Sequence, residues 1–186
     1  TAEALISQGC VLVSQHADTT GAAVACEAQK VYNVGYNVSM IDAAPNYAIT
    51  SASINWGPYV TYAVECALKG EEFPSDWCKG FSDGAVRITE VNKKAFASEE
   101  SYNNAMAKAT EAEDAIKAGT LHVFDTKNWT VDGKTITSTK DIEGYNGLEY
   151  IKTEGDVSYF QESTLASAPS FAFIIDGITE LNQNFG

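Results

Sequence analysis

The chain has 186 residues, of which 45% are hydrophobic and 20% are charged, the proportions of a folded globular protein and not of a disordered chain. Its formal net charge is −13, with only 12 lysines and arginines together. Such a chain lacks the basic surface that binding to nucleic acid requires. The longest apolar run, residues 171–175, is far too short to span a bilayer.

The first seventy residues alternate between strand and helix patterns. The opening residues read as the end of a helix that stops at Gly9, so we expect the sequence to be a fragment of a longer protein. The apolar run at residues 11–14 is typical of a parallel strand that is buried on both faces. Asp18 or Thr19 is expected to cap a helix at residues 21–29.

Two further strands, at residues 31–36 and 48–52, precede a helix that begins at Gly57-Pro58 and ends at Gly70. A fourth strand is expected at residues 84–91, and a long helix at residues 98–118. This order predicts an α/β domain over residues 1–120, with a mostly parallel sheet flanked by helices.

From residue 121 the pattern becomes less periodic. Asp132-Gly133 indicates a β-hairpin, and an irregular segment rich in glycine, asparagine and serine follows it. We therefore expect residues 121–186 to form an extended C-terminal tail.

The carboxyl ends of parallel strands meet at one edge of an α/β sheet, where ligands bind. Residues 15–19, 36–40 and 52–56 are polar or aromatic and follow the three predicted strands. We expect these stretches to converge. The candidate ligand-binding residues that they supply are Gln15, His16, Asp18, Asn37, Asn55 and Trp56.

Two of these candidates have specific chemistry. Trp56 offers a flat face for stacking, with the alternative of a core residue that packs the next helix. His16, held by the Asp18 carboxylate, can hydrogen-bond a ring nitrogen of a ligand; the alternative is that Asp18 caps the helix and His16 only packs. His122 lies outside this edge and is expected to be structural.

The four cysteines allow three pairings, of which local geometry favours Cys10 with Cys26 and Cys66 with Cys78. Disulfides would fit an oxidising compartment. Buried free thiols that act as small hydrophobic residues are the alternative. Neither histidine lies at zinc-ligand spacing from a cysteine, and we expect no metal site and no cofactor.

Catalytic motifs are missing from the sequence. Gly-x-Ser-x-Gly and Gly-x-Gly-x-x-Gly are absent. Asp132-Gly133-Lys134-Thr135 resembles a phosphate-binding loop, but Asn128 stands where the first glycine of that motif belongs. We expect a binding protein and not an enzyme. An α/β hydrolase that uses His16, Asp18 and a serine is a weaker alternative.

An ordered series of short segments resembles the basic membrane protein family, the PnrA-like lipoproteins, which are substrate-binding proteins of ABC transporters. The series covers most of residues 4–119 and is followed by a looser similarity to the end of the chain. Its segments are the run at residues 4–19, with Cys10 where alanine is usual, and residues 34–40, 44–45, 49–51, 55–59, 68–70, 80–86 and 116–119.

This resemblance implies a type I periplasmic-binding-protein fold, in which two α/β lobes close around a ligand. The chain would be the C-terminal lobe without its first strand, and residues 121–186 would cross toward or pack on the missing N-terminal lobe. The implied partners are a purine nucleoside or nucleobase, an ABC permease and, through a lipid anchor outside these residues, the outer face of the cell membrane. The implied location is extracytoplasmic, on that membrane face or in the periplasm.

The sequence departs from the family at two positions. Asn37 stands where an aspartate accepts from the ribose hydroxyls, and Ile54 falls at about the place of a lysine. Asparagine cannot form a charge-assisted bond, which weakens the case for a nucleoside and keeps a nucleobase or another small polar ring compound open. A ligand-sensing receptor of the same fold, without a role in transport, is the alternative function.

Overall fold

The computed structural model of the chain describes residues 1–161, 165 and 172–178. It divides the chain into two compact units. The first unit comprises Thr1–Phe73 and Lys79–Ala118, and the second comprises Pro74–Cys78 and Gly119–Gly186. The looser family similarity and the apolar run at residues 171–175 extend into residues 162–164, 166–171 and 179–186, which lie outside the described part of the chain.

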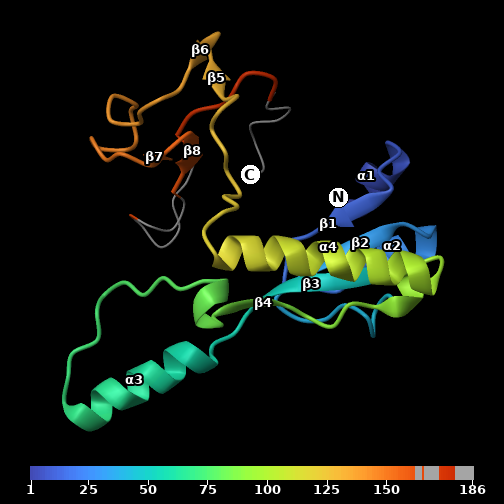
Figure 1. Cartoon of the computed structure of the whole chain (residues 1–186). Coiled ribbons are helices and arrows are strands. Elements are labelled where there is room, and N and C mark those ends of the chain that lie inside the picture. The colour runs from blue at the N-terminus through green and yellow to red at the C-terminus, as the bar shows by residue number, and fades with distance from the viewer. Residues whose placement is uncertain (162–164, 166–171, 179–186) are drawn as a thin grey trace. The chain divides into compact units, whose positions relative to one another are not determined.

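The first unit is built on a four-stranded sheet with the order β1-β2-β3-β4 (Figure 1). Its first three strands run parallel, and β4 is antiparallel to β3. The strands are β1 (Leu12–Ser14), β2 (Tyr32–Tyr36), β3 (Ala48–Ile54) and β4 (Val86–Ile88). The helices are α1 (Ala2–Ser7), α2 (Gly21–Gln29), α3 (Gly57–Lys69), the short 3₁₀ turns η1 (Phe81–Asp83) and η2 (Lys93–Ala95), and α4 (Glu99–Lys117). The predicted α/β class with a mostly parallel sheet is confirmed.

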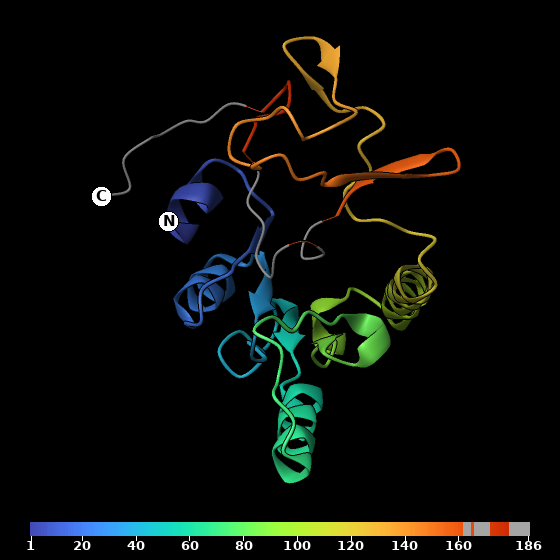
Figure 2. The same ribbon diagram turned by 90° about the vertical axis from the view of Figure 1, so that its left-hand side faces the viewer.

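The helices of this unit begin and end at the expected signals. Pro58 occupies the first turn of α3, and Gly70 ends that helix in the left-handed conformation with φ 69°. Ser98 caps α4 by accepting a hydrogen bond from the Ser101 amide. Figure 2 shows α2 and α4 on opposite sides of the sheet, whereas α3 extends away from the other elements of its unit. Among the helices of the described residues, none is long and apolar enough to cross a membrane.

The predicted cap of α2 is wrong. Thr20 occupies the N-cap position in a helical backbone conformation, and its side chain makes no capping hydrogen bond. Asp18, one of the two expected caps, bonds to Asn37 instead. The helix is held by packing, because Ala23 and Cys26 are fully buried on its inner side.

The prediction that the first strand is buried on both faces is also wrong. Val13 is 5% exposed, but Leu12 on the opposite face is 45% exposed. β1 is the edge strand of the sheet and pairs only with β2. The apolar run at the start of β1 therefore belongs to a strand with one buried face and one face that no element of the first unit covers.

The core of the first unit lies between the sheet and α2. Val13, Cys26 and Val31 form one buried cluster. Ala23, Met40, Ala44 and Ala48 form another. Small residues allow close approach here: a Cβ added at Gly35 would overlap the side chains of Ser51 and Met40. The strands are thereby held at a fixed separation up to their carboxyl ends.

The second unit contains two short hairpins, β5–β6 and β7–β8. The strands are β5 (Thr130–Val131), β6 (Lys134–Thr135), β7 (Ile151–Glu154) and β8 (Val157–Phe160). The predicted hairpin at Asp132-Gly133 is confirmed, and both turn residues have positive φ (51° and 72°), as a type I′ turn requires. The second hairpin turns at Gly155, with φ 60°. It falls in the segment that was expected to be irregular.

An aromatic cluster forms the core of the second unit. Phe160 is 2% exposed, and its ring stacks on that of Tyr150 with centroids 5.3 Å apart. Tyr145 and Trp129 lie beside it, with centroids 6.0 Å and 6.2 Å away. Aromatic pairs at such separations attract one another beyond simple burial. These rings fix the tail as a small folded unit.

The hairpin β5–β6 is held by one carboxylate from a distant part of the chain. Asp176 accepts hydrogen bonds from the Thr130 hydroxyl (2.6 Å) and from the amides of Asp132 (3.0 Å) and Gly133 (2.9 Å). The Thr130 hydroxyl, followed by the two amides, holds the pKa of Asp176 below its ordinary value. The charged form of this carboxylate is therefore the one that stabilises the hairpin.

Acid should open this hairpin. Because the pKa of Asp176 is lower in the folded state, its contribution is fully present above the unfolded value of about 3.9 and is lost as the pH falls through the folded value. Asp176→Asn should lower the hydrogen-exchange protection of the Gly133 amide at pH 7. In the wild type this protection should decrease below pH 4, and the substitution should remove most of that decrease. The exposed Asp141→Asn is the control and should leave both unchanged. An unchanged Gly133 protection in Asp176→Asn would contradict the assignment.

Candidate ligand-binding site

The carboxyl ends of β1, β2 and β3 lie together at one edge of the sheet, as the sequence predicted. The His16 ring, after β1, stacks on the Tyr36 ring at the end of β2, with centroids 4.1 Å apart. The side-chain nitrogen of Asn37 donates to the Asp18 carboxylate at 3.4 Å. Ser53, near the end of β3, donates its hydroxyl to the Asn37 carbonyl at 2.8 Å. Three segments that are distant in sequence, residues 15–19, 36–37 and 53–56, thus share one polar surface at the carboxyl ends of the strands. We call this surface the strand-end edge.

The expected His16–Asp18 pair is replaced by two other pairs. The imidazole lies against Tyr36, and the carboxylate accepts from Asn37. Both His16 and Asp18 are exposed, so the edge presents an imidazole and a carboxylate to solvent. The stacking ring, and not a carboxylate, sets the orientation of His16.

Asn37 adopts a backbone conformation that few residues accept. Its φ is 66°, in the left-handed region where asparagine is one of the tolerated residues. The backbone N–H of Asn37 donates to the Ala52 carbonyl at 2.6 Å, and the backbone carbonyl of Asn37 accepts from the Ser53 hydroxyl. This conformation turns the chain sharply out of β2 and leaves the Asn37 side chain at the edge beside Asp18.

Gln15 has a structural role that the sequence did not reveal. Its side-chain nitrogen donates to the carbonyls of Ala17 (2.9 Å) and Thr19 (2.8 Å), and its side-chain oxygen accepts from Asn33 (3.2 Å). Both ends of the amide are therefore engaged within the protein. Gln15 shapes the loop that carries His16 and Asp18.

Asn55 is engaged in the same manner. Its side-chain nitrogen donates to the Gly84 carbonyl at 2.8 Å, and its oxygen accepts from the Gly57 amide at 3.3 Å. The second bond satisfies one of the free amides at the start of α3. Asn55 thus fixes the direction in which the chain leaves β3.

Trp56 is the large aromatic residue of this edge. It is 60% exposed in the chain, and its ring meets that of Tyr59 edge-on, with centroids 6.3 Å apart. At this exposure Trp56 is not a core residue of the first unit. Trp56 offers a flat apolar face next to the polar strand ends.

The interior behind the edge holds two unsatisfied polar atoms. Asn33 Oδ1 and Ser51 Oγ are buried and have no hydrogen-bond partner among the described residues. Leaving such an atom without a partner costs about 1–3 kcal/mol of stability. Asn33 lies in β2 and Ser51 in β3, the two strands that end at Asn37 and Ser53.

Comparison with known proteins agrees with these features. The model of the Bmp family, described as PnrA-like ABC transporter substrate-binding proteins, matches residues 1–120. The chain belongs to this family. The resemblance seen in the sequence is thereby confirmed, and the family is one of solute-binding proteins and not of enzymes.

Two proteins similar to this PnrA-like chain are matched over only part of their own length. A purine-binding protein of Brucella abortus (strain 2308) is 29% identical over 123 residues, which are 66% of this chain and 33% of that protein. An ABC transporter solute-binding protein from Conexibacter woesei DSM 14684, a solved structure, is 18% identical with a TM-score of 0.49. That alignment covers 66% of this chain and 40% of the other. The chain thus spans about a third of the length of the curated relative.

The cysteines of the PnrA-like chain are free thiols, so neither of the favoured disulfide pairings is present. Cys26 and Cys66 are buried, Cys10 is half-buried and Cys78 is exposed. Burial raises the pKa of the Cys26 thiol, which keeps it protonated. The alternative of thiols that act as small hydrophobic residues describes Cys26 and Cys66.

Two further expectations concern His122 and metal ligands. His122 is in the second unit, where its ring stacks on Tyr159 at 3.5 Å between centroids, in keeping with a structural role. Within the described part of the chain, no group of three or more histidine, cysteine, aspartate or glutamate side chains is placed to hold a metal ion.

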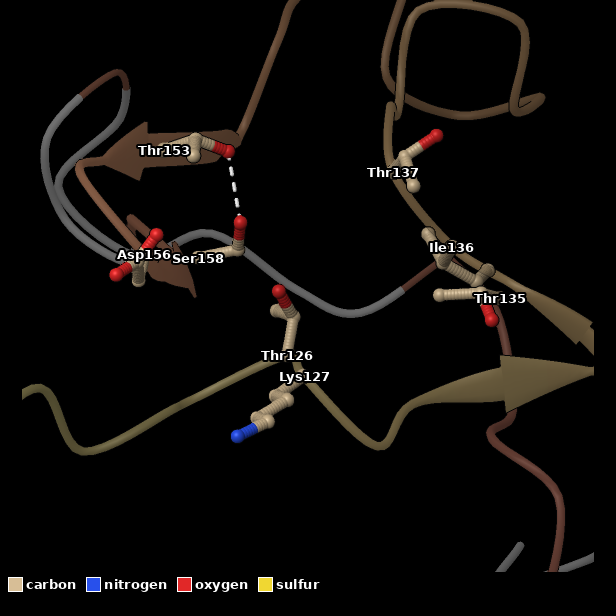
Figure 3. Close-up of a pocket in the computed structure, with 8 residues that line it drawn as sticks. All are labelled: Thr126, Lys127, Thr135, Ile136, Thr137, Thr153, Asp156 and Ser158. Atoms are coloured by element: carbon tan, nitrogen blue, oxygen red, sulfur yellow. Dashed lines mark hydrogen bonds between the residues drawn. The ribbon is translucent and has the colours of Figure 1, made fainter.

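A small pocket of about 250 Å³ is present in the second unit (Figure 3). Its lining consists mainly of hydroxyl side chains, and Figure 3 shows two of them, Thr153 and Ser158, hydrogen-bonded to each other at 2.7 Å. The lining residues are Thr126, Lys127, Thr135, Ile136, Thr137, Thr153, Asp156 and Ser158. This lining offers hydrogen bonds but no aromatic face.

Proposed function

We propose that the strand-end edge of the first unit is one wall of a binding site for a purine-like ring compound, in the solute-binding component of an ABC importer. The single observation that carries the proposal is the exposed Trp56 ring beside the polar ends of three strands. Family membership over residues 1–120 and a relative named as purine-binding support it. A ring that is flat, apolar on its faces and polar at its rim matches such a surface.

Each residue of the edge has a distinct role in this proposal. Trp56 stacks on the face of the ligand ring. Asp18 and the Asn37 oxygen accept hydrogen bonds from its N–H groups, and His16 bonds a ring nitrogen. Asn37 carries no charge, so a ribose gains no charge-assisted bond at this position. The edge therefore favours a nucleobase over a nucleoside.

The remaining parts of the importer follow from the same proposal. A single wall leaves one face of the ligand in water, so a second lobe is required to enclose it, and residues 121–186 extend toward that lobe. The ligand would be delivered to an ABC permease from an extracytoplasmic receptor held at the membrane by a lipid anchor. Enclosure by a second lobe should raise the affinity at least tenfold above that of the chain alone.

Nuclear magnetic resonance titration tests the proposal in the chain itself, since it detects millimolar binding. Adenine, guanine and hypoxanthine should shift the Trp56 indole signal and the amides of residues 15–19 and 36–37. Cytosine and the matching nucleosides should shift them less at equal concentration. The ligand should be recovered chemically unchanged. Shifts confined to the pocket around Thr126, or hydrolysis of a nucleoside, would overturn the proposal.

A further inference from the structure

Asn33 is a polar residue in the interior of the first unit. It lies in β2, is 0% exposed and has no contact with solvent at the strand-end edge. Its side-chain nitrogen donates to the Val13 carbonyl at 3.1 Å and to the Gln15 side-chain oxygen at 3.2 Å. Asn33 thus connects the middle of the sheet to the first residue after β1.

The Asn33 donor determines which way the Gln15 amide faces. Because the oxygen of Gln15 accepts from Asn33, its nitrogen faces the loop and donates to the carbonyls of Ala17 and Thr19. Those two bonds close the loop around the Gln15 side chain. His16 and Asp18 alternate with the bonded residues, so the same closure presents both side chains outward at the edge.

The chemistry of Asn33 indicates more than packing. Its Oδ1 atom is buried without a hydrogen-bond partner among the described residues, which is unfavourable for stability. An apolar side chain of similar size would avoid that loss but could not orient Gln15. Besides the bond to the Val13 carbonyl, the Asn33 side chain therefore contributes the orientation of Gln15 and, through it, the ordered loop.

We propose that Asn33 is a positioning residue that acts through Gln15 to hold His16 and Asp18 in their binding arrangement. This inference rests on the proposed binding function of the edge. It assigns a role to a residue that does not touch the ligand. The rigidity of the loop then becomes part of the affinity, since a preordered loop loses less freedom on binding.

The test compares two buried asparagines of the same unit. Asn33→Val should weaken adenine binding about tenfold and speed the hydrogen exchange of the Gln15 side-chain NH₂ protons. Asn92 is the matched control, being 6% exposed and donating to the carbonyls of Pro45 and Ala48, with its oxygen also satisfied. Asn92→Val should lower the melting temperature and leave adenine affinity unchanged in the folded protein.

A second variant gives a readout that loss of packing cannot imitate. In Asn33→Asp the ionised carboxylate can only accept hydrogen bonds. The Gln15 side chain must then turn its nitrogen toward residue 33 and away from the loop carbonyls. Burial raises the pKa of such a carboxyl, and protonation restores a donor. Its adenine affinity, relative to the wild type, should be low at pH 8 and recover toward pH 5.

The outcomes separate the two proposals. If Asn33→Val and Asn33→Asp bind adenine as the wild type does, Asn33 is only a core residue and the inference is wrong. If Asn33→Val does not fold, Gln15→Met, a change in a partly exposed loop residue, must show the same tenfold loss or the inference also fails. If the wild type binds no purine, the proposed function fails, while the Gln15 NH₂ exchange and its pH dependence still decide whether Asn33 orders the loop.

Discussion

Replacing Trp56 with alanine should lower the affinity for a purine base at least tenfold, which corresponds to about 1.4 kcal/mol. The ring is 60% exposed in the chain, so its removal takes away a stacking surface and little of the core. The melting temperature should therefore stay within about 2 °C of the wild type, as for most surface substitutions. Titration calorimetry or the NMR titration of the amides of residues 15–19 measures the affinity.

Two further variants make the Trp56 experiment specific. Trp56→Phe keeps an aromatic face and should retain most of the affinity. Leu68→Ala removes an 84% exposed apolar side chain near the C-terminus of α3, the helix that follows Trp56. It should leave the affinity unchanged. A Trp56→Ala protein that folds normally and binds as tightly as the wild type would show that the ring plays no part in recognition.

Replacing Phe160 with alanine should destabilise the second unit by about 3–5 kcal/mol. Phe160 is a fully buried ring in contact with Tyr150, Tyr145 and Trp129, so its loss leaves a cavity that the surrounding rings fill only in part. Since small domains are stable by only about 5–15 kcal/mol, this loss is a large share of the total. Urea unfolding followed by near-ultraviolet circular dichroism reports on the aromatic cluster directly.

Val157→Ala is the control for that experiment, because Val157 lies on the same strand but is 43% exposed. It should cost less than about 1 kcal/mol. Equal destabilisation by the two substitutions would mean that the aromatic cluster is not the core of the second unit.

The elements that could be predicted from the sequence are those with strong local signals. The helix from Gly57 is bounded by a proline in its first turn and by Gly70, and it formed as expected. Asp132-Gly133 needs two positive φ angles, which few residue pairs accept, and the hairpin is where it was predicted. The convergence of the strand ends followed from the parallel order of the strands alone.

The errors occurred where a distant contact overrides the local pattern. Three consecutive apolar residues open the run at residues 11–14, but its strand lies at the edge of the sheet, which periodicity does not reveal. The hairpin at Gly155 was missed, although a glycine followed by aspartate between two short runs is a turn signal. Lys152 and Glu154 obscured it, because three of the four residues of β7 are polar and exposed.

The roles of the edge residues show the same limit more sharply. Gln15 and Asn55 were grouped with the ligand contacts because they are polar and follow strands. Their partners, Asn33 and Gly84, are 18 and 29 positions away, and only the folded chain brings them together. Trp56 could not be assigned from sequence, since stacking and core packing require the same residue.

The left-handed backbone at Asn37 also limits what mutation can place there. A positive φ of 66° strongly disfavours β-branched residues and is best tolerated by asparagine, aspartate and glycine. Two of these differ only by an amide in place of a carboxylate. Position 37 can therefore carry an amide or a carboxylate on the same backbone, so one negative charge at the strand ends can be added or removed without refolding the turn.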